Sequence, residues 1–256
     1  MAAPLVATPE PPPEPLVAIV QVRGVLEQRA TMRVSGCGET QTDGYDAIES
    51  RFFGWCDYSG EQHPGALTDE NVSAIVLDVD SPGGDLAGLE QTIARVRAGV
   101  LASGKPCVGF VNEFAASAAL WMLVGICDAV YLPPSGLLGS VGCYVFFQSE
   151  ARHLLEDDKV DTYIARQPDG KARPHPAEPI DPIGQARLDA RAVVGEAAFV
   201  AAVAKLRGLT PEEVRGWNGQ IFIGEDAVTV GLADGIGSLE DVVALARELS
   251  GMKAAA

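Results

Sequence analysis

The feature that most constrains the fold is a series of apolar segments that alternate between the spacing of a buried strand and that of a helix. Residues 74–79 are nearly all apolar, which is typical of a strand covered on both faces. Between 86 and 100, apolar residues recur every three or four positions, which predicts a helix. A strand at 107–111, a helix at 115–126 and a strand at 129–132 continue the alternation. This order predicts an α/β fold of βαβ units around a parallel sheet.

Weaker patterns flank this centre. The sequence predicts a strand at 17–22, a short helix at 45–55, a charged helix near 149–158, a strand near 162–165 and a long helix whose buried face is Leu188, Ala192, Phe199, Val203 and Leu206. Thr210-Pro-Glu-Glu213 is a capping box that predicts a further helix start. Six prolines predict a flexible tail over residues 1–16. We therefore expect one domain at 17–248 and a frayed tail at 249–256.

The charge of the chain argues against nucleic acid as a partner. The formal net charge is −16, no cluster of Lys or Arg is evident, and such a field repels a phosphate backbone. The apolar run Phe114–Cys127 is shorter than the ~20 residues of a membrane-spanning helix, so it predicts a buried core helix. No basic segment followed by an apolar one marks a secretory signal at the N-terminus. We therefore expect no membrane anchor.

The cysteines predict neither disulfides nor zinc. They are odd in number, contain no Cys-x-x-Cys pair, and three of them lie in apolar stretches; their positions are Cys37, Cys56, Cys107, Cys127 and Cys143. This usage fits a reducing compartment, with a cytoplasmic location as the expectation.

Two segments carry candidate chemistry. Asp80-Ser-Pro-Gly-Gly84 follows a strand, and its adjacent glycines could present backbone N–H groups to an oxyanion. Taken alone, these residues fit an ordinary strand-to-helix turn better. Ser117 lies where a strand ends and an apolar helix begins, so its hydroxyl and the Ala118 N–H would sit in the positive field of the helix N-terminus. Ser117 could be a nucleophile, or it could simply cap the helix.

The residues alone do not select a base for Ser117. His63, His153 and His175 are the only histidines, and none lies beside a carboxylate-bearing motif. A buried lysine can serve when its pKa falls far enough for the amine to be neutral. Lys171 lies in a Pro- and Gly-containing segment at 168–174 that, by composition, is an exposed loop.

The chain resembles the signal peptide peptidase A family of serine peptidases, and especially its short phage-type members used in head maturation. Four motifs in the family's order carry the resemblance: Leu77-Asp-Val-Asp-Ser-Pro-Gly-Gly84, Asn112-Glu-Phe-Ala-Ala-Ser-Ala-Ala119, Gly139-Ser-Val-Gly142 and Ile221-Phe-Ile-Gly-Glu-Asp-Ala-Val-Thr-Val-Gly-Leu-Ala-Asp234. They extend over most of the region from 17 to 237.

The resemblance implies roles for individual residues. The family's nucleophile matches Ser117, its oxyanion loop matches Gly83 and Gly84, and the serine that orients its lysine matches Ser140. The family's lysine lies a little over fifty residues after the nucleophile, and Lys171 follows Ser117 by 54 residues. Measured from the preceding glycine, Arg173 would occupy that position. Measured back from Pro176 and the helix that ends at Arg207-Gly208, Lys171 occupies it without a gap. We prefer this downstream register because the length of a helix is harder to alter than that of a loop, and because an arginine stays protonated and cannot act as a base.

The resemblance also implies a fold and a function. The fold would be a crotonase-like or Clp-protease-like spiral of stacked βαβ units. The activity would be that of a serine endopeptidase with a Ser–Lys dyad, acting on a scaffold or capsid polypeptide in the host cytoplasm or a phage procapsid. It would require no metal or other cofactor. Short family members share each active site between subunits, which implies a homo-oligomer with Lys171 donated by a neighbour. Two alternatives stay open: a non-catalytic assembly protein of the same fold, and a crotonase-type acyl-CoA enzyme.

Overall fold

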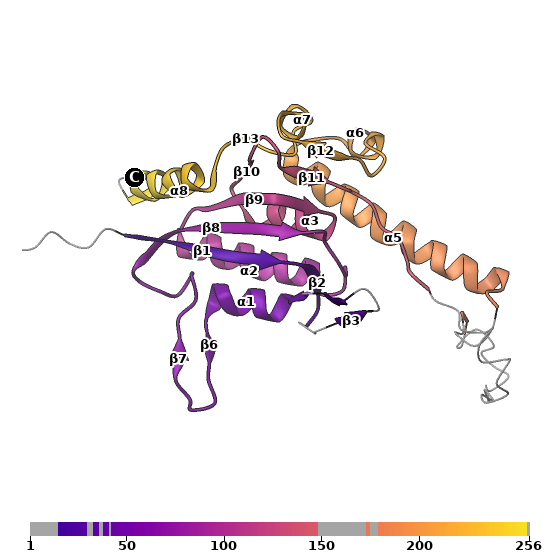
Figure 1. Ribbon diagram of the computed structural model, residues 1–256, viewed down its shortest axis with the longest axis horizontal. Helices are drawn as coiled ribbons and strands as arrows, with labels where there is room; N and C mark the ends of the chain where they lie inside the picture. The colour runs from indigo at the N-terminus through magenta and orange to yellow at the C-terminus, as the bar shows by residue number, and fades with distance from the viewer. Residues whose placement is uncertain are drawn as a thin grey trace, which may run out of the picture.

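The computed structural model describes residues 15–29, 33–35, 38–40, 42–147, 173–174 and 179–254. Within these residues, a seven-stranded sheet forms the centre of the molecule, and its longest path runs in the order β1-β8-β9-β10-β13 (Figure 1). All neighbouring strands along this path are parallel. The predicted α/β architecture of βαβ units around a parallel sheet is confirmed.

The strands of this sheet are β1 (Leu16–Arg23), β8 (Val72–Ser81), β9 (Cys107–Ala116), β10 (Ala129–Leu132), β11 (Leu137–Gly139), β12 (Ile221–Ile223) and β13 (Gly235–Ile236). Three two-stranded pairs add β2 (Val25–Glu27) with β5 (Thr42–Gly44), β3 (Arg33–Ser35) with β4 (Gly38–Thr40), and β6 (Trp55–Cys56) with β7 (Gln62–His63). The helices are α1 (Tyr45–Phe53), α2 (Leu89–Ser103), α3 (Ala118–Ile126), α5 (Pro182–Arg207), α6 (Pro211–Gly216), α7 (Glu225–Thr229) and α8 (Leu239–Ala254).

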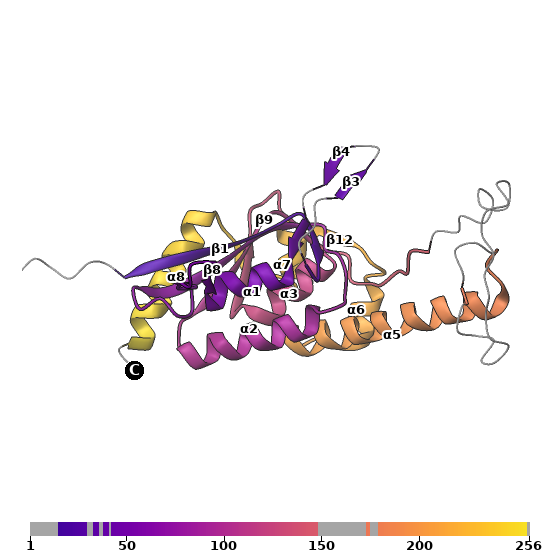
Figure 2. The same ribbon diagram turned by 90° about the horizontal axis from the view of Figure 1, so that it is seen from below.

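Both faces of the central sheet are covered. Helices α1, α2 and α3 lie on one face and α8 on the other, as Figures 1 and 2 show. Strand β8 accordingly sends Leu77 and Val79 into the larger core, whereas Ala74 and Val76 pack with α8. This two-sided burial explains why the strand is apolar almost throughout.

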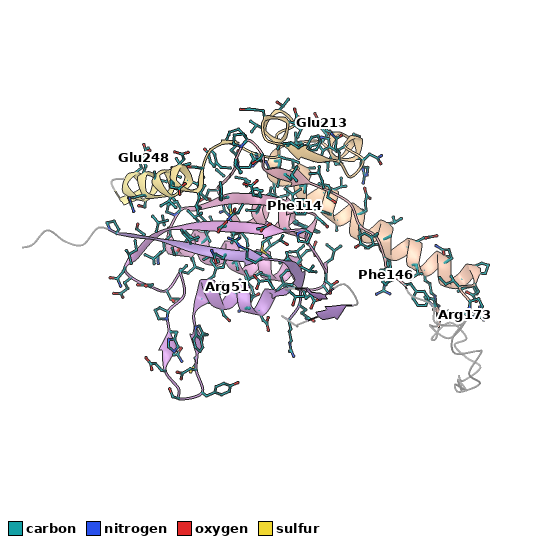
Figure 3. All side chains as sticks on the ribbon, viewed as in Figure 1. Arg51, Phe114, Phe146, Arg173, Glu213 and Glu248 are labelled. Atoms are coloured by element: carbon teal, nitrogen blue, oxygen red, sulfur yellow. The ribbon has the colours of Figure 1, made fainter. Side chains whose placement is uncertain are left out.

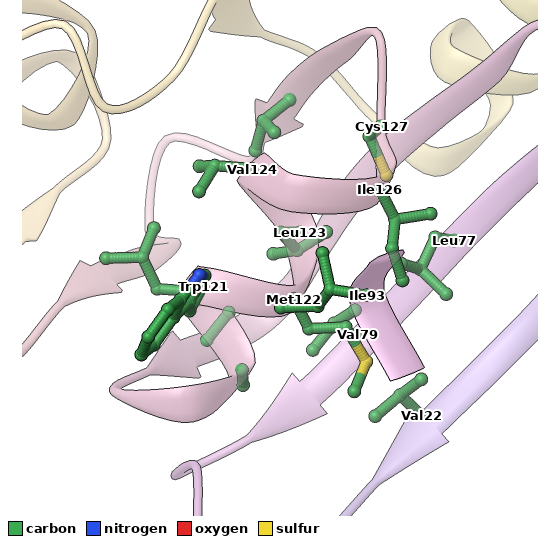
Figure 4. Packing of buried hydrophobic residues seen from close by; sticks show 14 of the residues in the cluster. Val22, Leu77, Val79, Ile93, Trp121, Met122, Leu123, Val124, Ile126 and Cys127 are labelled. Carbon is green, nitrogen blue, oxygen red and sulfur yellow. The ribbon is translucent and has the colours of Figure 1, made fainter. Parts of the chain in front are cut away.

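Helix α3 is the centre of the larger core. All nine of its residues are buried, and Figure 4 shows Met122, Leu123 and Ile126 packed among side chains of the sheet and of α2. The prediction that the apolar run at 114–127 is a core element rather than a membrane span is confirmed. No helix within the described ranges combines the length and the apolar character that crossing a membrane requires.

Strand β9 changes partners along its length, and this positions its C-terminal end. Val108–Phe110 pair with β10, whereas Phe114–Ala116 pair with β11. The pairing with β8 is interrupted between these two parts, where Glu113 has a φ of 70°. Just before Ser117, the end of β9 has therefore exchanged β10 for β11 as its neighbour within the same sheet.

The structure corrects several predicted boundaries. The helix expected from 115 begins at Ala118, because Ala115 and Ala116 belong to β9 and pair with β11. Residues 249–254 of the predicted tail belong to α8, which continues to Ala254 with Leu249 packed on the sheet. The short helix at 45–55 is confirmed as α1, and the long helix is α5, although Leu206 on its predicted buried face is exposed. The elements predicted near 149–158 and 162–165, and most of the 1–16 tail, lie outside the described residues.

Candidate active site

Ser117 occupies a strained turn between β9 and α3. Its φ of 54° and ψ of −124° lie outside the helical and strand regions, a conformation that costs of order 1–3 kcal/mol in a non-glycine residue. The Ser117 N–H donates to the carbonyl oxygen of Gly139 at 2.9 Å, which holds the turn in place. The hydroxyl makes no capping hydrogen bond to α3. The structure therefore does not support a capping role for this hydroxyl and leaves it half-buried at the head of the helix.

Gly83 packs directly against Ser117. A Cβ atom at Gly83 would lie 2.7 Å from Ser117 Cβ and 2.9 Å from the Ala118 nitrogen, and the φ of Gly83 is +94°. Only glycine fits this approach without strain. The Gly83 N–H donates to the buried hydroxyl of Ser81 at 3.1 Å, so this N–H is already engaged. Gly83 therefore contributes to the site by close packing.

The N–H group of Gly84 points away from β2, the strand on which the Gly84 segment is bridged. The Leu26 N–H donates to the Gly83 carbonyl at 2.8 Å, and the Asp85 N–H donates to the Leu26 carbonyl at 2.9 Å. In such a parallel bridge, the N–H of the middle residue points away from the partner strand. Gly84 is exposed, and Ala118, as the first residue of α3, has an N–H without a partner inside the helix. Of the predicted oxyanion residues, Gly84 and Ala118 are thus the ones that offer open donors.

Ser140 is held next to Ser117 by the C-terminal part of the chain. It follows Gly139, the residue that accepts the Ser117 N–H, and its own N–H donates to the Gln220 carbonyl at 2.9 Å. A Cβ atom at Gly139 would lie 2.4 Å from the Gln220 oxygen, so the two segments are in close contact. The φ of Ser140 is 59°, which makes it the second strained serine of this region.

The structure does not place the predicted base. Lys171 lies outside the described residues, as do His153 and His175. Arg173, the competing position, forms an ion pair with Asp181, the N-cap of α5, and lies at the outer end of that helix (Figure 3). This pairing gives Arg173 a structural role.

Two other cationic or basic side chains can be set aside as bases. Lys105 Nζ donates to the carbonyls of Ala66, Leu67 and Asp69 at 2.7–3.0 Å, and burial lowers the pKa of this amine. It precedes β9, however, whereas Ser117 follows the last residue of that ten-residue strand, roughly 30 Å away. His63 stacks on Trp55 in the β6–β7 hairpin, which projects away from the sheet (Figure 1).

The same hairpin brings three metal-ligating groups together. Ligand atoms of Asp57, Glu61 and His63 all lie within 4.8 Å of one another. Asp57 Oδ1, however, accepts hydrogen bonds from the Ser59 hydroxyl, the Glu61 N–H and the Ser59 N–H, and these bonds lower the pKa of the Asp57 carboxyl. These contacts order the hairpin turn, so the cluster has a sufficient structural explanation.

Two residues of the site were given no role by the sequence, although Ser81 lies within the Asp80-Ser-Pro-Gly-Gly84 segment. Ser81 is fully buried and joins Gly83 to the end of β1, because its hydroxyl also donates to the Gly24 carbonyl at 2.6 Å. Tyr45 donates its phenol hydroxyl to the Asp85 carbonyl at 2.5 Å. Burial raises the pKa of Tyr45, and the nearby charge of Asp85 adds to the shift. Only the folded arrangement shows that both residues hold the loop beside Ser117.

Residues 100–253 of the chain match peptidase family S49. The chain is 31% identical over 198 residues to "Protease 4" of Salmonella typhi, a match that covers 77% of this chain and 31% of that protein. It is 30% identical over 236 residues to "Head-tail preconnector protein GP5" of Enterobacteria phage P21, covering 90% of this chain and 42% of the relative. With "Capsid assembly protease C" of Escherichia phage lambda the identity is 25% over 238 residues, covering 91% and 49%. The chain therefore spans about a third to a half of the length of these relatives.

Among solved structures, a serine-to-alanine mutant of the "1510-N membrane-bound stomatin-specific protease" superposes with a TM-score of 0.49 at 13% sequence identity. The superposition covers 90% of this chain and 83% of that one.

Proposed function

Because the chain belongs to peptidase family S49, we propose that it is a serine endopeptidase with Ser117 as nucleophile and Lys171 as general base. The observation that carries the proposal is the geometry of Ser117. Its hydroxyl is free of capping bonds at a strained strand-to-helix turn, with the open N–H groups of Gly84 and Ala118 nearby. A nucleophile beside fixed N–H donors is what acyl transfer requires.

The reaction would proceed by acyl transfer. The neutral amine of Lys171 takes the proton from the Ser117 hydroxyl, and the oxygen attacks the peptide carbonyl. The N–H groups of Gly84 and Ala118 stabilise the negative charge on the carbonyl oxygen. The protonated Lys171 then gives its proton to the leaving amine, and water hydrolyses the acyl-enzyme by the same route in reverse. Ser140, adjacent to the contact between Gly139 and Ser117, would orient the lysine.

A neighbouring subunit would supply Lys171. Pro174 packs against Gly184 near the start of α5, fifteen residues before Phe199, which stacks on Trp121 of α3 at 4.9 Å. At 1.5 Å per residue, that separation along α5 is about 22 Å. Pro174, three residues after Lys171 in the sequence, therefore lies at the far end of α5 from α3, which favours donation of Lys171 to another copy of the chain.

The outer half of α5 presents apolar surface for such a contact. Ile183, Val193 and Val194 are exposed on the helix, as are Tyr144 and Phe146 on the adjacent segment (Figure 3). A second copy packed here would remove these side chains from water and enclose the Lys171 loop. Desolvation of the loop would lower the pKa of the lysine toward the value that a base needs.

The relatives suggest the biological setting. Two of them have names that refer to phage head–tail connection or capsid assembly. We therefore propose that the substrate is a scaffold or capsid polypeptide, cleaved in the host cytoplasm or inside a procapsid.

Replacement of Ser117 tests the proposal. The wild-type protein should be labelled at Ser117 by a fluorophosphonate probe and should digest denatured casein. Ser117→Ala should lose both, with activity down by several orders of magnitude. Ser59→Ala, in the exposed turn of the β6–β7 hairpin, is the matched control and should behave as wild type. Retention of more than a few per cent of activity by Ser117→Ala would show that the nucleophile lies elsewhere. A wild-type protein that neither reacts nor cleaves would favour an assembly role, and retention on immobilised CoA would favour an acyl-CoA enzyme.

Subunit mixing tests the shared site. Inactive Ser117→Ala and Lys171→Ala proteins, mixed so that their subunits exchange, should regain part of the wild-type activity, because some sites then combine an intact serine with an intact lysine. Sedimentation of differently tagged subunits establishes that mixed oligomers form. Mixed oligomers without activity would show that both residues act within one chain.

A further inference from the structure

Two segments in contact with Ser117 converge again on α5. The first runs from Gly83, which packs on Ser117, to Leu86. The second runs from Gly139, which accepts the Ser117 N–H, to Cys143. Both segments are three to four residues long from their contact with Ser117 to their meeting point, a span of roughly 10 Å if extended.

The meeting point is Gly195 in the middle of α5. A Cβ atom at Gly195 would lie 2.7 Å from Cys143 Sγ and 3.1 Å from Leu86 Cδ1. The two side chains are thus close to one another and rest on the bare backbone of the helix. Glycine in a helix interior is destabilising by about 1 kcal/mol relative to alanine, yet here it is what allows the contact. Leu86 and Cys143 are both half-buried, so each retains surface for a ligand.

A second contact places Gly195 on the side of α5 that faces α3. Phe199 lies one turn further along α5 and stacks on Trp121, which lies one turn into α3 from Ser117. One helical turn is 5.4 Å, so Gly195 and Ser117 each lie a single turn from the same aromatic pair. The point where Leu86 and Cys143 meet is therefore close to the nucleophile.

The segment after Ser140 has backbone groups available for a peptide. Residues 141–147 run beside α5 in Figures 1 and 2, and no backbone-to-backbone hydrogen bond joins them to any residue in the described ranges. Tyr144 and Phe146 are exposed, whereas Cys143 and Val145 are half-buried. This alternation is that of a strand with one side chain in two directed toward the helix. An extended peptide can add to such an edge.

We propose that Leu86, Cys143 and Gly195 form an apolar subsite that selects a small or medium-sized aliphatic side chain of the substrate, two or three residues from the scissile bond. The inference rests on the proposed peptidase function and specifies its selectivity. The subsite is apolar because a leucine side chain, a thiol and the bare helix backbone at Gly195 line it. Burial also raises the pKa of the Cys143 thiol, which favours its neutral form. The size of the subsite depends on the side chain at position 143 and on the absence of a side chain at position 195.

Cleavage-site profiling tests the subsite. Denatured casein is digested with the full chain, the cleaved bonds are identified by mass spectrometry, and rates are normalised to the number of Ser117 residues that a fluorophosphonate probe titrates. Cys143→Ala enlarges the subsite and should increase cleavage beside larger aliphatic side chains about tenfold relative to small ones, at one position only. Cys143→Leu places a larger side chain in the subsite, and Gly195→Ala adds a methyl group to the helix beneath it. Both variants should shift cleavage toward small side chains. Cys56→Ala, an exposed thiol in the β6–β7 hairpin, should leave the profile unchanged.

The outcomes separate the subsite from the activity. An active wild-type protein whose profile stays the same in all three variants, or changes equally at every substrate position, would overturn the subsite and leave the peptidase intact. A wild-type protein that neither reacts with the probe nor cleaves casein would overturn both. The use of two positions, 143 and 195, keeps the test valid if one variant fails to fold.

Discussion

Replacement of Ser81 by alanine tests whether a buried hydroxyl holds the active-site loop. Ser81 is the last residue of β8 and is fully buried. Its hydroxyl donates to the Gly24 carbonyl at 2.6 Å and accepts the Gly83 N–H at 3.1 Å. The Ser81→Ala variant removes both bonds at once without changing the backbone.

The size of the effect follows from these two bonds. The Gly83 N–H is buried and would be left without a partner, which costs about 1–3 kcal/mol, and the loss of the second hydrogen bond adds about 1 kcal/mol. The free energy of unfolding should therefore fall by about 2–4 kcal/mol. With a slope of about 2 kcal/mol per molar urea, the midpoint should shift by about 1–2 M. Because Gly83 packs on Ser117, normalised casein cleavage should also fall, by tenfold or more.

The assay is urea unfolding followed by circular dichroism at one fixed protein concentration. Ser73→Ala is the matched control, since Ser73 lies near the other end of β8 and its hydroxyl makes only long contacts, at 3.3–3.4 Å. That variant should change the unfolding free energy by less than about 0.5 kcal/mol. Equal midpoints for Ser81→Ala and Ser73→Ala would refute the idea that the Ser81 hydroxyl holds the loop.

Three further predictions concern the same site. Gly83→Ala places a Cβ atom 2.7 Å from Ser117 Cβ at a φ of +94°, so labelling of Ser117 by the fluorophosphonate probe should fall at least a hundredfold. A variant that is labelled as fast as the wild type would contradict the packing described. Lys171→Ala should reduce casein cleavage as much as Ser117→Ala does, whereas Arg173→Ala should remain active, and wild-type activity should rise with pH as the lysine amine becomes neutral. An inactive Arg173→Ala with an active Lys171→Ala would show that position 173, and not 171, matches the family's lysine. Burial raises the pKa of Tyr45 in the folded state, so the protonated phenol should stabilise the fold below about pH 10, and this contribution should be lost as the pH rises and the unfolded chain ionises. Tyr45→Phe should therefore be less stable than the wild type at neutral pH, because its hydrogen bond is lost, but its stability should decline less steeply at alkaline pH. Urea midpoints measured over a series of pH values would contradict this if the two proteins declined in parallel.

The sequence by itself determined which segments of the chain become buried. The continuous apolar character of β8, the three-and-four spacing of α2 and the apolar run of α3 depend only on neighbouring residues, and each predicted element is present. The same local reasoning placed Ser117 at a strand-to-helix junction. It misplaced the start of α3 because Ala115 and Ala116 are equally compatible with both structures, and pairing with β11 decides between them.

Only the tertiary structure decided what surrounds Ser117. Gly83, Gly139 and Gly195 are far apart in sequence, and each meets its neighbours at distances where a single added carbon would collide. The bonds of Ser81 and Tyr45 likewise join segments separated by tens of residues. Such contacts leave no local periodicity, because they depend on which strands share an edge and on how closely two backbones approach. The burial pattern of a segment depends on its own residues, whereas the contacts of a site depend on the packing of the whole core.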